Sequence, residues 1–577
     1  MIAEKSAPVL AGLMMDRSLQ ISRLIDHAAL WHGDVEIVTQ RTGLPDQRSN
    51  YRQVRARSAQ LAHALRQRLG VAAGERVATF AWNTQRHLEL YYGVSGIGAV
   101  LHTINPRLFA AQIAYIVNHA RDRFIFLDAD LVPVLEPLAA QLPHVEGYVV
   151  LCAENDLPPT SLPGALAYET LIAGFPDDIV WPELDERTAS SLCYTSGTTG
   201  NPKGVLYAHR STLLHTFAQA ASWQAGAGSQ TSILPVVPLF HANAWGLPYL
   251  APMQGSKLVF ADPHLDPAAL YDALEREQVT LSCGVPTIWL RLLEHLERND
   301  LRFSSLKLLG VGGAAAPRSM IEAFEVKYDV RVMNAWGMTE TSPACTFGIP
   351  KAEHDVLPQR IDYKTCAGRC LFGVELRIVD DAGVAQPFDG VAQGEIHVRG
   401  PWIASGYFED EEATARGITA DGWLRTGDIA TVDPDGYVAI RDRAKDVIKS
   451  GGEWISSIDL ENVAVAHPDV AEAAAIGVPH PTWSERPVLF AVPKAGRELD
   501  PAAVRAFLDG KIAKWWMPDE VIVVAELPHT ATGKVSKRTL REQHAAALAS
   551  MEETVDSLGD EVGKAKLYFE KRRELSS

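Results

Sequence analysis

The sequence predicts an α/β protein that is built from more than one domain, and three observations lead to this prediction. Strand-like and helix-like segments alternate along residues 20–150, which is typical of parallel β-α-β layers. Residues 373–441 change to short segments with period-two alternation, which indicates a small β subdomain. The chain has 577 residues, more than one hydrophobic core supports, so we expect at least two domains.

The alternation in the first region can be followed segment by segment. Residues 76–82, 99–104 and 123–127 are short apolar runs of strand type, while residues 85–96 and 110–119 have helical spacing. None of these segments carries a pattern that demands a functional site.

Composition and charge exclude several classes of function. Hydrophobic residues make up 47% of the chain and charged residues 22%, which is typical of a globular protein. The formal net charge of −17 argues against binding to nucleic acid and against adsorption on anionic membranes. An anionic ligand must therefore be bound by local cations and backbone dipoles.

The six cysteines and the apolar runs bear on the compartment. No two cysteines form a C-x-x-C pair, and Cys345, Cys366 and Cys370 have no fourth zinc ligand at a suitable spacing, so we expect reduced thiols. No apolar run approaches the ~18 residues of a membrane span, and residues 1–8 lack the pattern of a signal peptide. We expect a cytoplasmic protein without an integral membrane segment.

One stretch, residues 195–204 (Thr-Ser-Gly-Thr-Thr-Gly-Asn-Pro-Lys-Gly), indicates phosphate binding. It lies between a strand-like run at residues 189–194 and a helical run at residues 210–221. Glycines let backbone N–H groups point toward one anion, and the hydroxyls and Lys203 add donors. The stretch is not a Walker loop, because Pro202 precedes the lysine and a glycine follows it. On composition alone, a Ser/Thr/Gly surface loop remains the alternative.

This stretch resembles the phosphate loop of the adenylate-forming superfamily, which comprises acyl-CoA synthetases, peptide-synthetase adenylation domains and luciferases. Further motifs of the superfamily follow in the same order, so the resemblance covers about residues 20–545. It implies a large N-terminal domain followed by a small, mobile α+β domain. The implied boundaries are an AMP-binding domain at 1–442, with α/β layers at about 20–185 and 186–350 and a β subdomain at 351–442, a hinge at 443–449, a C-terminal domain at 450–545 and a charged, helical tail at 546–577.

Residues 234–246 are expected to have an irregular backbone, because Pro235 and Pro238 exclude a regular helix. Taken alone, His241 is more readily a hydrogen-bonded core residue, and Trp245 can be a packing residue. The segment resembles the Phe-His-x-x-x-Trp stretch of fatty acyl-CoA synthetases. That resemblance implies that His241 borders the carboxylate end of the acyl pocket. It also implies that Trp245 is a gate across the acyl tunnel, which opens when ATP binds.

Two later segments are expected to bind adenosine and metal. Residues 306–311 read as a buried strand, and the small residues at 312–317 leave room for a ligand at its carboxyl end. Residues 336–340 (Trp-Gly-Met-Thr-Glu) resemble the family's (Y/W)-G-x-T-E motif, in which the aromatic ring covers the adenine. An isolated Glu340 would read as a solvated surface charge. The motif instead implies a hard oxygen ligand for Mg²⁺, with the Thr195 hydroxyl as its partner.

The last motifs imply a ribose site, a hinge and a catalytic lysine. Asp428 would accept hydrogen bonds from the ribose hydroxyls, with Arg443 as the complementary donor. Lys445 matches the hinge position of the family, and a polar turn is the alternative on sequence alone. A lysine in a Thr-Gly-Lys turn is ordinarily solvated, but the place of Lys534 in the family motif implies the catalytic lysine. It would bridge the attacking carboxylate oxygen and the α-phosphate of ATP.

The C-terminal domain has the pattern of a small α+β unit. Residues 473–478 and 520–525 are strand-like, and residues 501–514 have helical spacing. The resemblance implies that this domain rotates about Lys445 after the first half-reaction. Lys534 would then leave the site, and the segment at residues 449–454 would face the CoA channel.

The resemblance assigns further contacts by position. ATP or AMP would contact Thr195, Ser196, Gly197, Thr198, Thr199, Gly200, Lys203, Gly313, Ala314, Ala315, Trp336, Gly337, Met338, Thr339, Asp428, Arg443 and Lys534. The acyl pocket and gate would comprise His241, Trp245 and Gly312, the catalytic group Lys534, His241 and Thr195, and the CoA side Lys449, Ser450, Gly451, Gly452 and Trp454.

These motifs predict an ATP-dependent, AMP-forming acyl-CoA ligase, with Mg²⁺ as cofactor and with ATP, CoA and a carboxylic acid as substrates. We expect a medium- or long-chain fatty acid, because residues 190–246 and 421–455 resemble the bacterial medium-chain branch. Three alternatives stay open: the same chemistry on a short thioether, branched or alicyclic acid, an adenylation enzyme that loads a carrier protein, and an inactive nucleotide- or lipid-binding relative. A homodimer also stays open.

Overall fold

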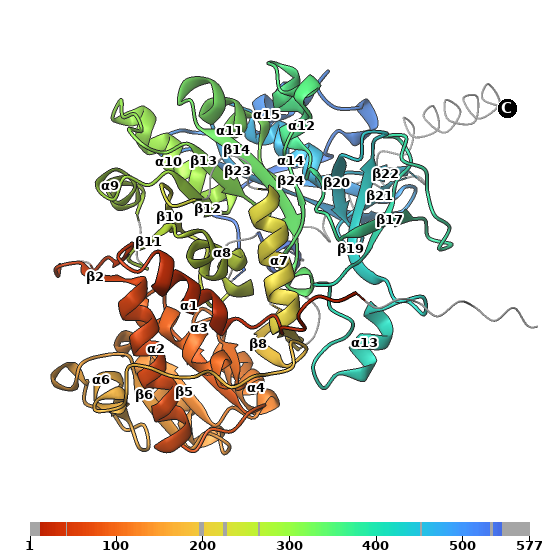
Figure 1. Ribbon diagram of the computed structural model, residues 1–577. Helices are drawn as coiled ribbons and strands as arrows, with labels where there is room; N and C mark the ends of the chain where they lie inside the picture. Colours follow the sequence, from red (N-terminus) through yellow and green to blue (C-terminus); the bar gives the residue numbers. More distant parts are fainter. Residues whose placement is uncertain are drawn as a thin grey trace, which may run out of the picture.

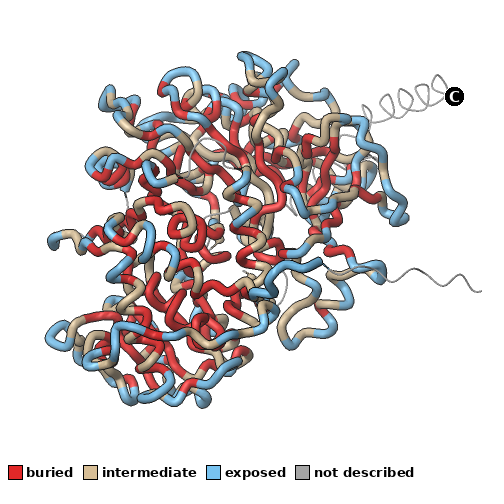
Figure 2. Tube along the Cα trace, viewed as in Figure 1, coloured by how far each residue is buried: buried red, intermediate tan, exposed pale blue. Residues whose placement is uncertain are grey.

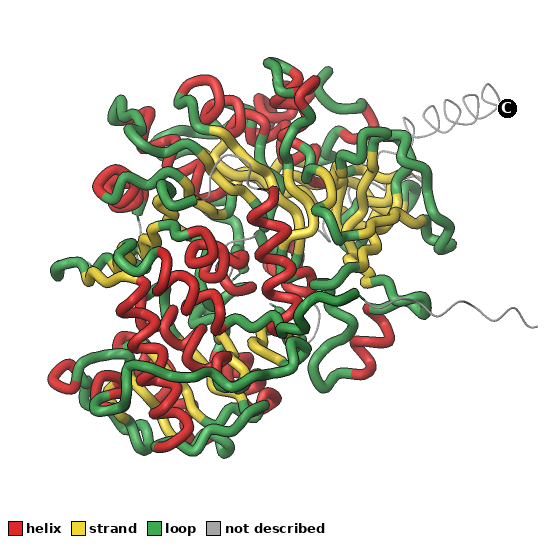
Figure 3. The backbone as a smooth tube through the Cα atoms, viewed as in Figure 1, coloured by secondary structure: helices red, strands yellow, loops and turns green. Residues whose placement is uncertain are grey.

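Two largely parallel sheets, covered by helices, form the body of the N-terminal region (Figures 1 and 3). The computed structural model describes residues 12–41, 43–195, 201–222, 228–263, 266–450, 453–530 and 535–544. The first sheet has the strand order β7-β6-β5-β3-β4-β8-β9, and the second has the order β16-β15-β14-β13-β12-β10-β11-β1-β2. The predicted α/β class is therefore confirmed.

The observed strands agree with most of the strand-like runs in the sequence. The first sheet consists of β3 (Arg76–Phe80), β4 (Val100–Thr103), β5 (Phe124–Leu127), β6 (Gly147–Val150), β7 (Leu166–Ala167), β8 (Ala189–Tyr194) and β9 (Gly204–Ala208). The second consists of β1 (Glu36–Thr39), β2 (Gln47–Asn50), β10 (Ser232–Pro235), β11 (Lys257–Phe260), β12 (Leu281–Gly284), β13 (Leu308–Val311), β14 (Arg331–Gly337), β15 (Ala344–Phe347) and β16 (Arg369–Cys370).

The order of the strands in the chain does not decide which of the two sheets a strand belongs to. Strand β1 lies near the start of the chain, yet it pairs in parallel with β11 of the second sheet. Strands β8 and β9, which flank the phosphate loop, pair antiparallel at the edge of the first sheet. The expected layer boundary near residue 185 therefore does not follow sheet membership, because the pairing joins strands that are distant in the chain.

Helices pack on both sheets, and several begin at a polar capping residue. Thr84 accepts a hydrogen bond from the His87 N–H at the start of α3, and Asp266 caps α9 in the same way. The helices of this region are α1 (Ser22–Trp31), α2 (Tyr51–Gln67), α3 (Gln85–Gly96), α4 (Ala110–Ala120), α5 (Val132–Leu135), α6 (Tyr168–Ile172), α7 (His209–Ser222), α8 (Leu247–Gln254), α9 (Pro267–Arg276), α10 (Pro286–Arg298), α11 (Arg318–Glu322), α12 (Gln359–Thr365) and α13 (Glu411–Gly417).

An antiparallel sheet in the order β17-β18-β19-β20 forms the β subdomain, at the right of Figure 1. A second small sheet, β22-β21-β24-β23 with β25 beside β24, belongs to the C-terminal domain. The elements are β17 (Glu375–Val379), β18 (Gly394–Arg399), β19 (Leu424–Val432), β20 (Val438–Arg443), β21 (Ile448–Ser450), β22 (Glu453–Ile455), α14 (Ser457–Val465), β23 (Val470–His480), β24 (Ser484–Pro493), α15 (Pro501–Leu508), β25 (Glu520–Val523) and α16 (Lys537–Gln543).

One helix of the C-terminal domain is shorter than predicted. The helical spacing suggested residues 501–514, but α15 ends at Leu508. Gly510 has φ of +74°, a left-handed conformation that glycine adopts readily just after a helix. Ile512 therefore packs on the core from an irregular segment, which a short 3₁₀ helix at Lys514–Trp516 follows.

The apolar cores of the two regions are separate. Buried side chains such as Tyr91, Phe126 and Trp289 fill the body around the two large sheets, whereas Leu489 and Phe490 belong to cores within the C-terminal domain. Figure 2 shows these buried segments in red, with the exposed loops outside them. Among the residues that the structure describes, no helix is long and apolar enough to cross a membrane.

Candidate active site

A cavity of about 1510 Å³ lies where the second sheet, the β subdomain and the C-terminal domain meet. Residues at the carboxyl ends of β10, β12, β13 and β14 line it, which is where open α/β sheets bind ligands. The predicted site residues on its wall are Thr195, Lys203, His241, Trp245, Gly312, Gly313, Ala314, Ala315, Trp336, Gly337, Met338, Thr339, Glu340, Arg443 and Lys445.

The base of the phosphate loop is closed by two hydrogen bonds. The Thr195 N–H donates to the Lys203 carbonyl at 2.9 Å, and the Lys203 N–H donates to the Thr195 hydroxyl oxygen at 3.3 Å. Residues 196–200 of the loop lie outside the described residues. Because both ends of the loop line the cavity, the hydroxyl and the ammonium that the motif predicted are available to an anion there.

Glu340 is a buried carboxylate in the cavity wall, with 5% of its surface exposed. It lies in the turn Thr339–Thr341 that follows β14. Burial raises the pKa of the Glu340 carboxyl, and a hydrogen bond from the Tyr407 hydroxyl to Oε1 at 2.8 Å partly opposes this. A carboxylate that is removed from water and has one such neutral donor is stabilised by a cation, so the residues present fit a Mg²⁺ ion.

The residues of the predicted ribose site form an ion pair and a hydrogen bond with one another. Arg443 Nε lies 2.8 Å from one oxygen of Asp428, and the Trp336 indole N–H donates to the other oxygen at 2.8 Å. These contacts arise because Asp428 and Arg443 are partners in the β19–β20 ladder. Asp428 is buried behind them and is not part of the cavity wall in this arrangement. The carboxylate thus orients the tryptophan ring that is predicted to cover the adenine.

The predicted gate lies on an unusual backbone. Residues 242–245 all have φ between +44° and +58°, a left-handed turn that costs non-glycine residues energy. The Gln219 amide donates to the Trp245 carbonyl at 2.8 Å and holds the end of this turn. A Cβ at Gly312 would lie 3.2 Å from Trp245 Cη2, so the indole packs directly on that glycine. The prolines correctly predicted an irregular segment, although not its handedness.

The C-terminal domain turns one predicted segment toward the cavity. Thr530 and Val535, on either side of the catalytic-lysine turn, line the cavity, whereas Lys534 itself lies outside the described residues. Lys449 and Ser450 do not line it, and Gly451 and Gly452 also lie outside the description. Trp454 borders a separate cavity of about 100 Å³. Thr530 and Val535, the described neighbours of the lysine turn, therefore lie at the large cavity, whereas the described CoA-side residues Lys449, Ser450 and Trp454 do not line it.

Several cavity residues were missed by the sequence reasoning. The side chain of Lys537 is 12% exposed and has a raised pKa, because Glu461 at 2.6 Å and Asp442 outweigh the desolvation that would lower it. The Arg107 guanidinium lies 5.7 Å from the Trp82 ring centre. Tyr407 was also missed. Each of these residues acts through partners that are distant in sequence, so no local pattern signalled it.

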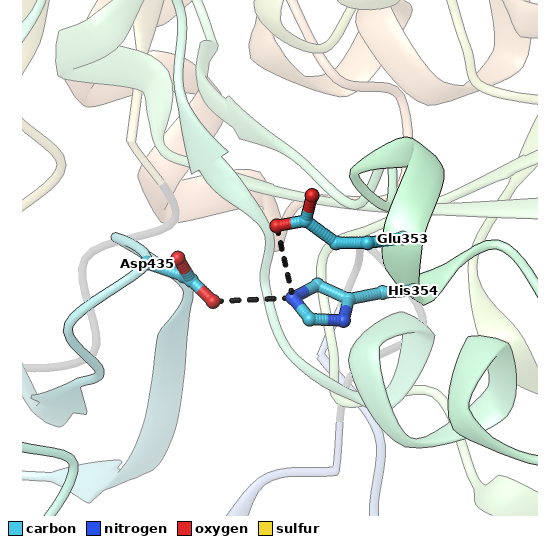
Figure 4. A group of neighbouring side chains, drawn as sticks. All are labelled: Glu353, His354 and Asp435. Carbon is cyan, nitrogen blue, oxygen red and sulfur yellow. Dashed lines mark hydrogen bonds and ion pairs between the residues drawn. The ribbon is translucent and has the colours of Figure 1, made fainter.

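One group outside the cavity has the composition of a metal site. His354 Nε2 lies 3.1 Å from Asp435 Oδ2 and 4.0 Å from Glu353 Oε1 (Figure 4). Lys351 also pairs with Asp435, and the imidazole stacks on Tyr363 with ring centres 4.0 Å apart. Because an ammonium already neutralises this carboxylate, we interpret the group as an ion-pair network that joins a loop to the β19–β20 hairpin.

Comparison with known proteins identifies the family. The family profile "AMP-binding enzyme" matches residues 25–408, and the profile "AMP-binding enzyme C-terminal domain" matches residues 459–534. The chain belongs to the AMP-binding enzyme family. Within that family it is an AMP-forming acyl-CoA ligase, as the following relatives indicate.

The similarity extends over almost the whole chain. It is 50% identical over 541 residues to the 3-methylmercaptopropionyl-CoA ligase of Ruegeria lacuscaerulensis, covering 93% of this chain and 99% of that relative. It is 46% identical over 535 residues to the medium-chain-fatty-acid–CoA ligase of Ectopseudomonas oleovorans, covering 92% and 97%. A crystal structure of the anthranilate CoA ligase AuaEII with anthranoyl-AMP superposes with a TM-score of 0.83 at 26% identity, covering 93% and 99%.

Proposed function

We propose that this ligase activates an unbranched, apolar carboxylic acid, a medium- or long-chain fatty acid in the first instance, and transfers its acyl group to CoA. The observation that carries the proposal is one cavity that joins the phosphate-loop ends, Glu340 and the pair Thr530 and Val535 to an apolar wall. That wall includes Val237, Phe240 and Met333. Apolar side chains favour an alkyl chain because its burial removes it from water.

A short thioether acid is the second candidate, and the 50% identity to a 3-methylmercaptopropionyl-CoA ligase favours it. The two candidates differ less than their names suggest. In 3-methylmercaptopropionate a sulfur replaces one methylene of pentanoate, and a thioether sulfur is apolar and polarisable. A linear apolar slot would therefore accept both acids, and the length of the slot would decide between them.

The first half-reaction must bring two anions together. A carboxylate oxygen attacks the α-phosphate of ATP, forming a carboxylate–phosphate bond and releasing pyrophosphate. Electrostatic repulsion opposes this approach, so preorganised positive charge and positioning supply most of the catalysis. Lys203 and the loop amides would hold the outer phosphates, and Lys534 would bridge the two reacting groups. Arg443 and Trp336 would position the nucleoside.

Glu340 and the Thr195 hydroxyl are the residues that would hold Mg²⁺. The bound ion would supply positive charge that offsets the negative charge of the phosphates. Glu340 contributes by being buried: a carboxylate with 5% exposure attracts a cation more strongly than one in water. The chain also directs the carboxylate, since the 2.8 Å hydrogen bond from Tyr407 restrains Oε1.

The second half-reaction is the attack of the CoA thiolate on the acyl carbonyl carbon. It forms the thioester and expels AMP. Lys534 has no role in that step, so the C-terminal domain would rotate about Lys445 and bring the segment at residues 449–454 toward the acyl-adenylate. The orientation described above, in which Thr530 and Val535 line the large cavity, would correspond to the first half-reaction in this scheme.

A panel of acids tests the proposed substrate. The purified protein is incubated with ATP, Mg²⁺, CoA and each acid from acetate to palmitate, together with 3-methylmercaptopropionate, a branched acid, cyclohexanecarboxylate and benzoate. Acyl-CoA and AMP are quantified, and kcat/KM is ranked. We expect the maximum among linear acids of five or more chain atoms. A maximum at acetate or benzoate would contradict the proposal, and acyl transfer to a carrier protein in preference to CoA would establish the carrier-loading alternative.

A further inference from the structure

Tyr407 touches the two charged groups that the proposed ATP site depends on. Its hydroxyl donates to Glu340 Oε1 at 2.8 Å, and Lys203 Nζ lies 4.9 Å from the centre of its ring. All three side chains line the large cavity. We propose that Tyr407 is a positioning residue that holds the metal-binding carboxylate and the phosphate-loop lysine in one arrangement. This inference rests on the function proposed above.

The segment that carries Tyr407 is attached to both sides of the site. The Ala404 N–H donates to the Glu340 carbonyl at 2.8 Å, and the Phe408 N–H donates to the Gly204 carbonyl at 2.8 Å. The first bond reaches the metal motif, and the second reaches the residue directly after Lys203. Residues 404–408 therefore form a strap between the two motifs. The strap cannot move relative to either motif without breaking a main-chain hydrogen bond.

Residues of α13 hold Tyr407 in place. Its backbone N–H donates to the Thr414 hydroxyl at 2.9 Å, and a Cβ at Gly417 would lie 3.0 Å from Tyr407 Cε2. The edge of the ring at Cε2 thus packs against α13.

The two contacts of Tyr407 have separate consequences. The hydroxyl restrains one oxygen of Glu340, which leaves the other oxygen oriented for a cation; partners of this kind typically change metal affinity 10–100-fold. The ring face attracts the Lys203 ammonium by a cation–π interaction and keeps it in the cavity. Removal of the hydroxyl should therefore impair the metal-dependent part of nucleotide binding, and removal of the ring should also impair the metal-independent part.

Calorimetric titration with AMPPNP separates these parts without measuring activity. The titration contains no carboxylic acid, so the α–β bond of this ATP analogue, whose imido bridge joins the β- and γ-phosphates, stays intact. The Kd is measured once with excess Mg²⁺ and once with EDTA, and the ratio of the two is the metal-dependent gain. For Tyr407→Phe we expect the gain to fall about 10-fold relative to the unmodified chain, with the Kd in EDTA unchanged within twofold. For Tyr407→Leu we expect the same loss of gain and, in addition, a 3- to 10-fold weaker Kd in EDTA.

A matched control removes a tyrosine hydroxyl elsewhere. Tyr271 on α9 donates to the Arg302 carbonyl at 2.7 Å, and neither residue lines the cavity, so Tyr271→Phe should bind like the unmodified chain in both conditions. If Tyr407→Phe does not fold, as judged by thermal melting, Gly417→Ala takes its place, since the added methyl group displaces the same ring. It should lower the gain at least twofold.

Two outcomes overturn the inference. An unchanged metal-dependent gain in Tyr407→Phe, or in Gly417→Ala where that variant is needed, shows that the hydroxyl does not position Glu340. Equal Kd values in EDTA for Tyr407→Leu and Tyr407→Phe show that the ring does not position Lys203. Failure of the proposed ATP site gives a different result, because the unmodified chain would then bind AMPPNP in neither condition. Failure of the proposed acid preference would appear only in the acid panel.

Discussion

The two walls of the active-site cavity are built differently. On the N-terminal side, site residues are fixed by buried hydrogen bonds: the Tyr207 hydroxyl donates to the Thr339 carbonyl at 2.6 Å, and Asp428 is bound on both oxygens. On the C-terminal side, the contacts across the hinge are polar. The Ser457 N–H donates to Asp442 Oδ2 at 2.7 Å, and the Arg441–Asp459 ion pair has a separation of 3.5 Å.

This difference indicates which wall is able to move. Within the described ranges, each apolar core cluster lies entirely before the hinge or entirely after it. Rotation of the C-terminal domain would therefore break polar contacts that water can replace, and it would expose little apolar core. Polar interdomain interfaces of this kind favour relative motion. In the mechanism proposed above, the rigid wall would hold the nucleotide and the mobile wall would supply Lys534.

The largest effect is expected from removing that lysine. Lys534→Ala should slow acyl-adenylate formation by ~10²–10³-fold, the usual loss for one preorganised donor. Conversion of chemically prepared acyl-AMP and CoA to acyl-CoA should stay within a few-fold of normal. Pyrophosphate release and thioester formation are measured separately. Lys494→Ala, a lysine of the same domain outside the cavity lining, is the control. Equal losses in the two half-reactions would contradict the division between the walls.

A substitution that stiffens the hinge should impair the second half-reaction and leave the first largely intact. Proline at position 445 fixes φ near −65°, so Lys445→Pro should restrict rotation. Adenylation should persist, because the captured orientation already places Thr530 and Val535, which flank the lysine turn, at the cavity. We expect thioester formation from acyl-AMP to fall ~10-fold or more, as is found when a conformational step limits turnover. Lys445→Ala serves as the control, since it removes the same side chain without restricting the backbone; a similar loss in both variants would exclude a hinge effect.

The substitution Trp245→Ala tests the N-terminal wall of the cavity. Because its indole packs on Gly312, Trp245→Ala should open the path between the acyl and nucleotide parts of the cavity. We expect kcat/KM for long acids to rise relative to short acids by ~10-fold or less, since each buried methylene contributes about 0.8 kcal/mol. The acid panel measures this ratio, and the exposed Trp31→Ala is the control. An unchanged ratio would show that Trp245 is a packing residue.

The smallest effect concerns an ion pair beside the lysine turn. His529 Nε2 lies 3.4 Å from Glu472, which raises the pKa of His529 and lowers the pKa of Glu472. The lowered carboxyl pKa stabilises the fold above its unfolded value near 4.5, and this contribution is lost as the pH falls. The raised imidazole pKa stabilises the fold fully below its unfolded value near 6.5, and this contribution is lost as the pH rises.

His529→Gln should therefore lower the melting temperature at pH 5.5–6 and leave it unchanged at pH 8.5. The pair is partly exposed, so the loss is at most ~1 kcal/mol, or about 2 °C. Thermal melts at the two pH values measure it, with the exposed His144→Gln as control. A shift of the same size at both pH values would rule out the ion pair as its cause.

The parts of the site that could be predicted from the sequence each lie within one continuous stretch of residues. The phosphate stretch, the Trp336–Glu340 motif and the irregular segment at residues 234–246 were recognised, and the structure brings their described residues to one cavity. The helix at residues 85–96 was also located, because apolar periodicity and the Thr84 cap are local signals.

What could not be predicted depends on residues that are distant in the chain. Tyr407 and Glu340 are 67 positions apart, and Trp336 and Asp428 are 92 positions apart. Apolar periodicity in the sequence does not predict contacts between residues that are so far apart. It does not predict the parallel pairing of β1 with β11 either. The left-handed turn at residues 242–245 was missed for a different reason: it contains alanine and tryptophan, which do not favour positive φ, so its cause lies in tertiary contacts.

The movement of the C-terminal domain is the claim on which the two half-reactions depend. Spin labels at the exposed positions Arg298 and Glu498, in a chain with Cys366 and Cys370 replaced by serine, would report the distance between α10 and the C-terminal domain by pulsed electron resonance. The account predicts one distance with ATP and a non-reactive acid analogue, and a second, distinct distance with acyl-AMP and a CoA analogue that lacks the thiol. A single distance distribution, unchanged by either set of ligands, would contradict it.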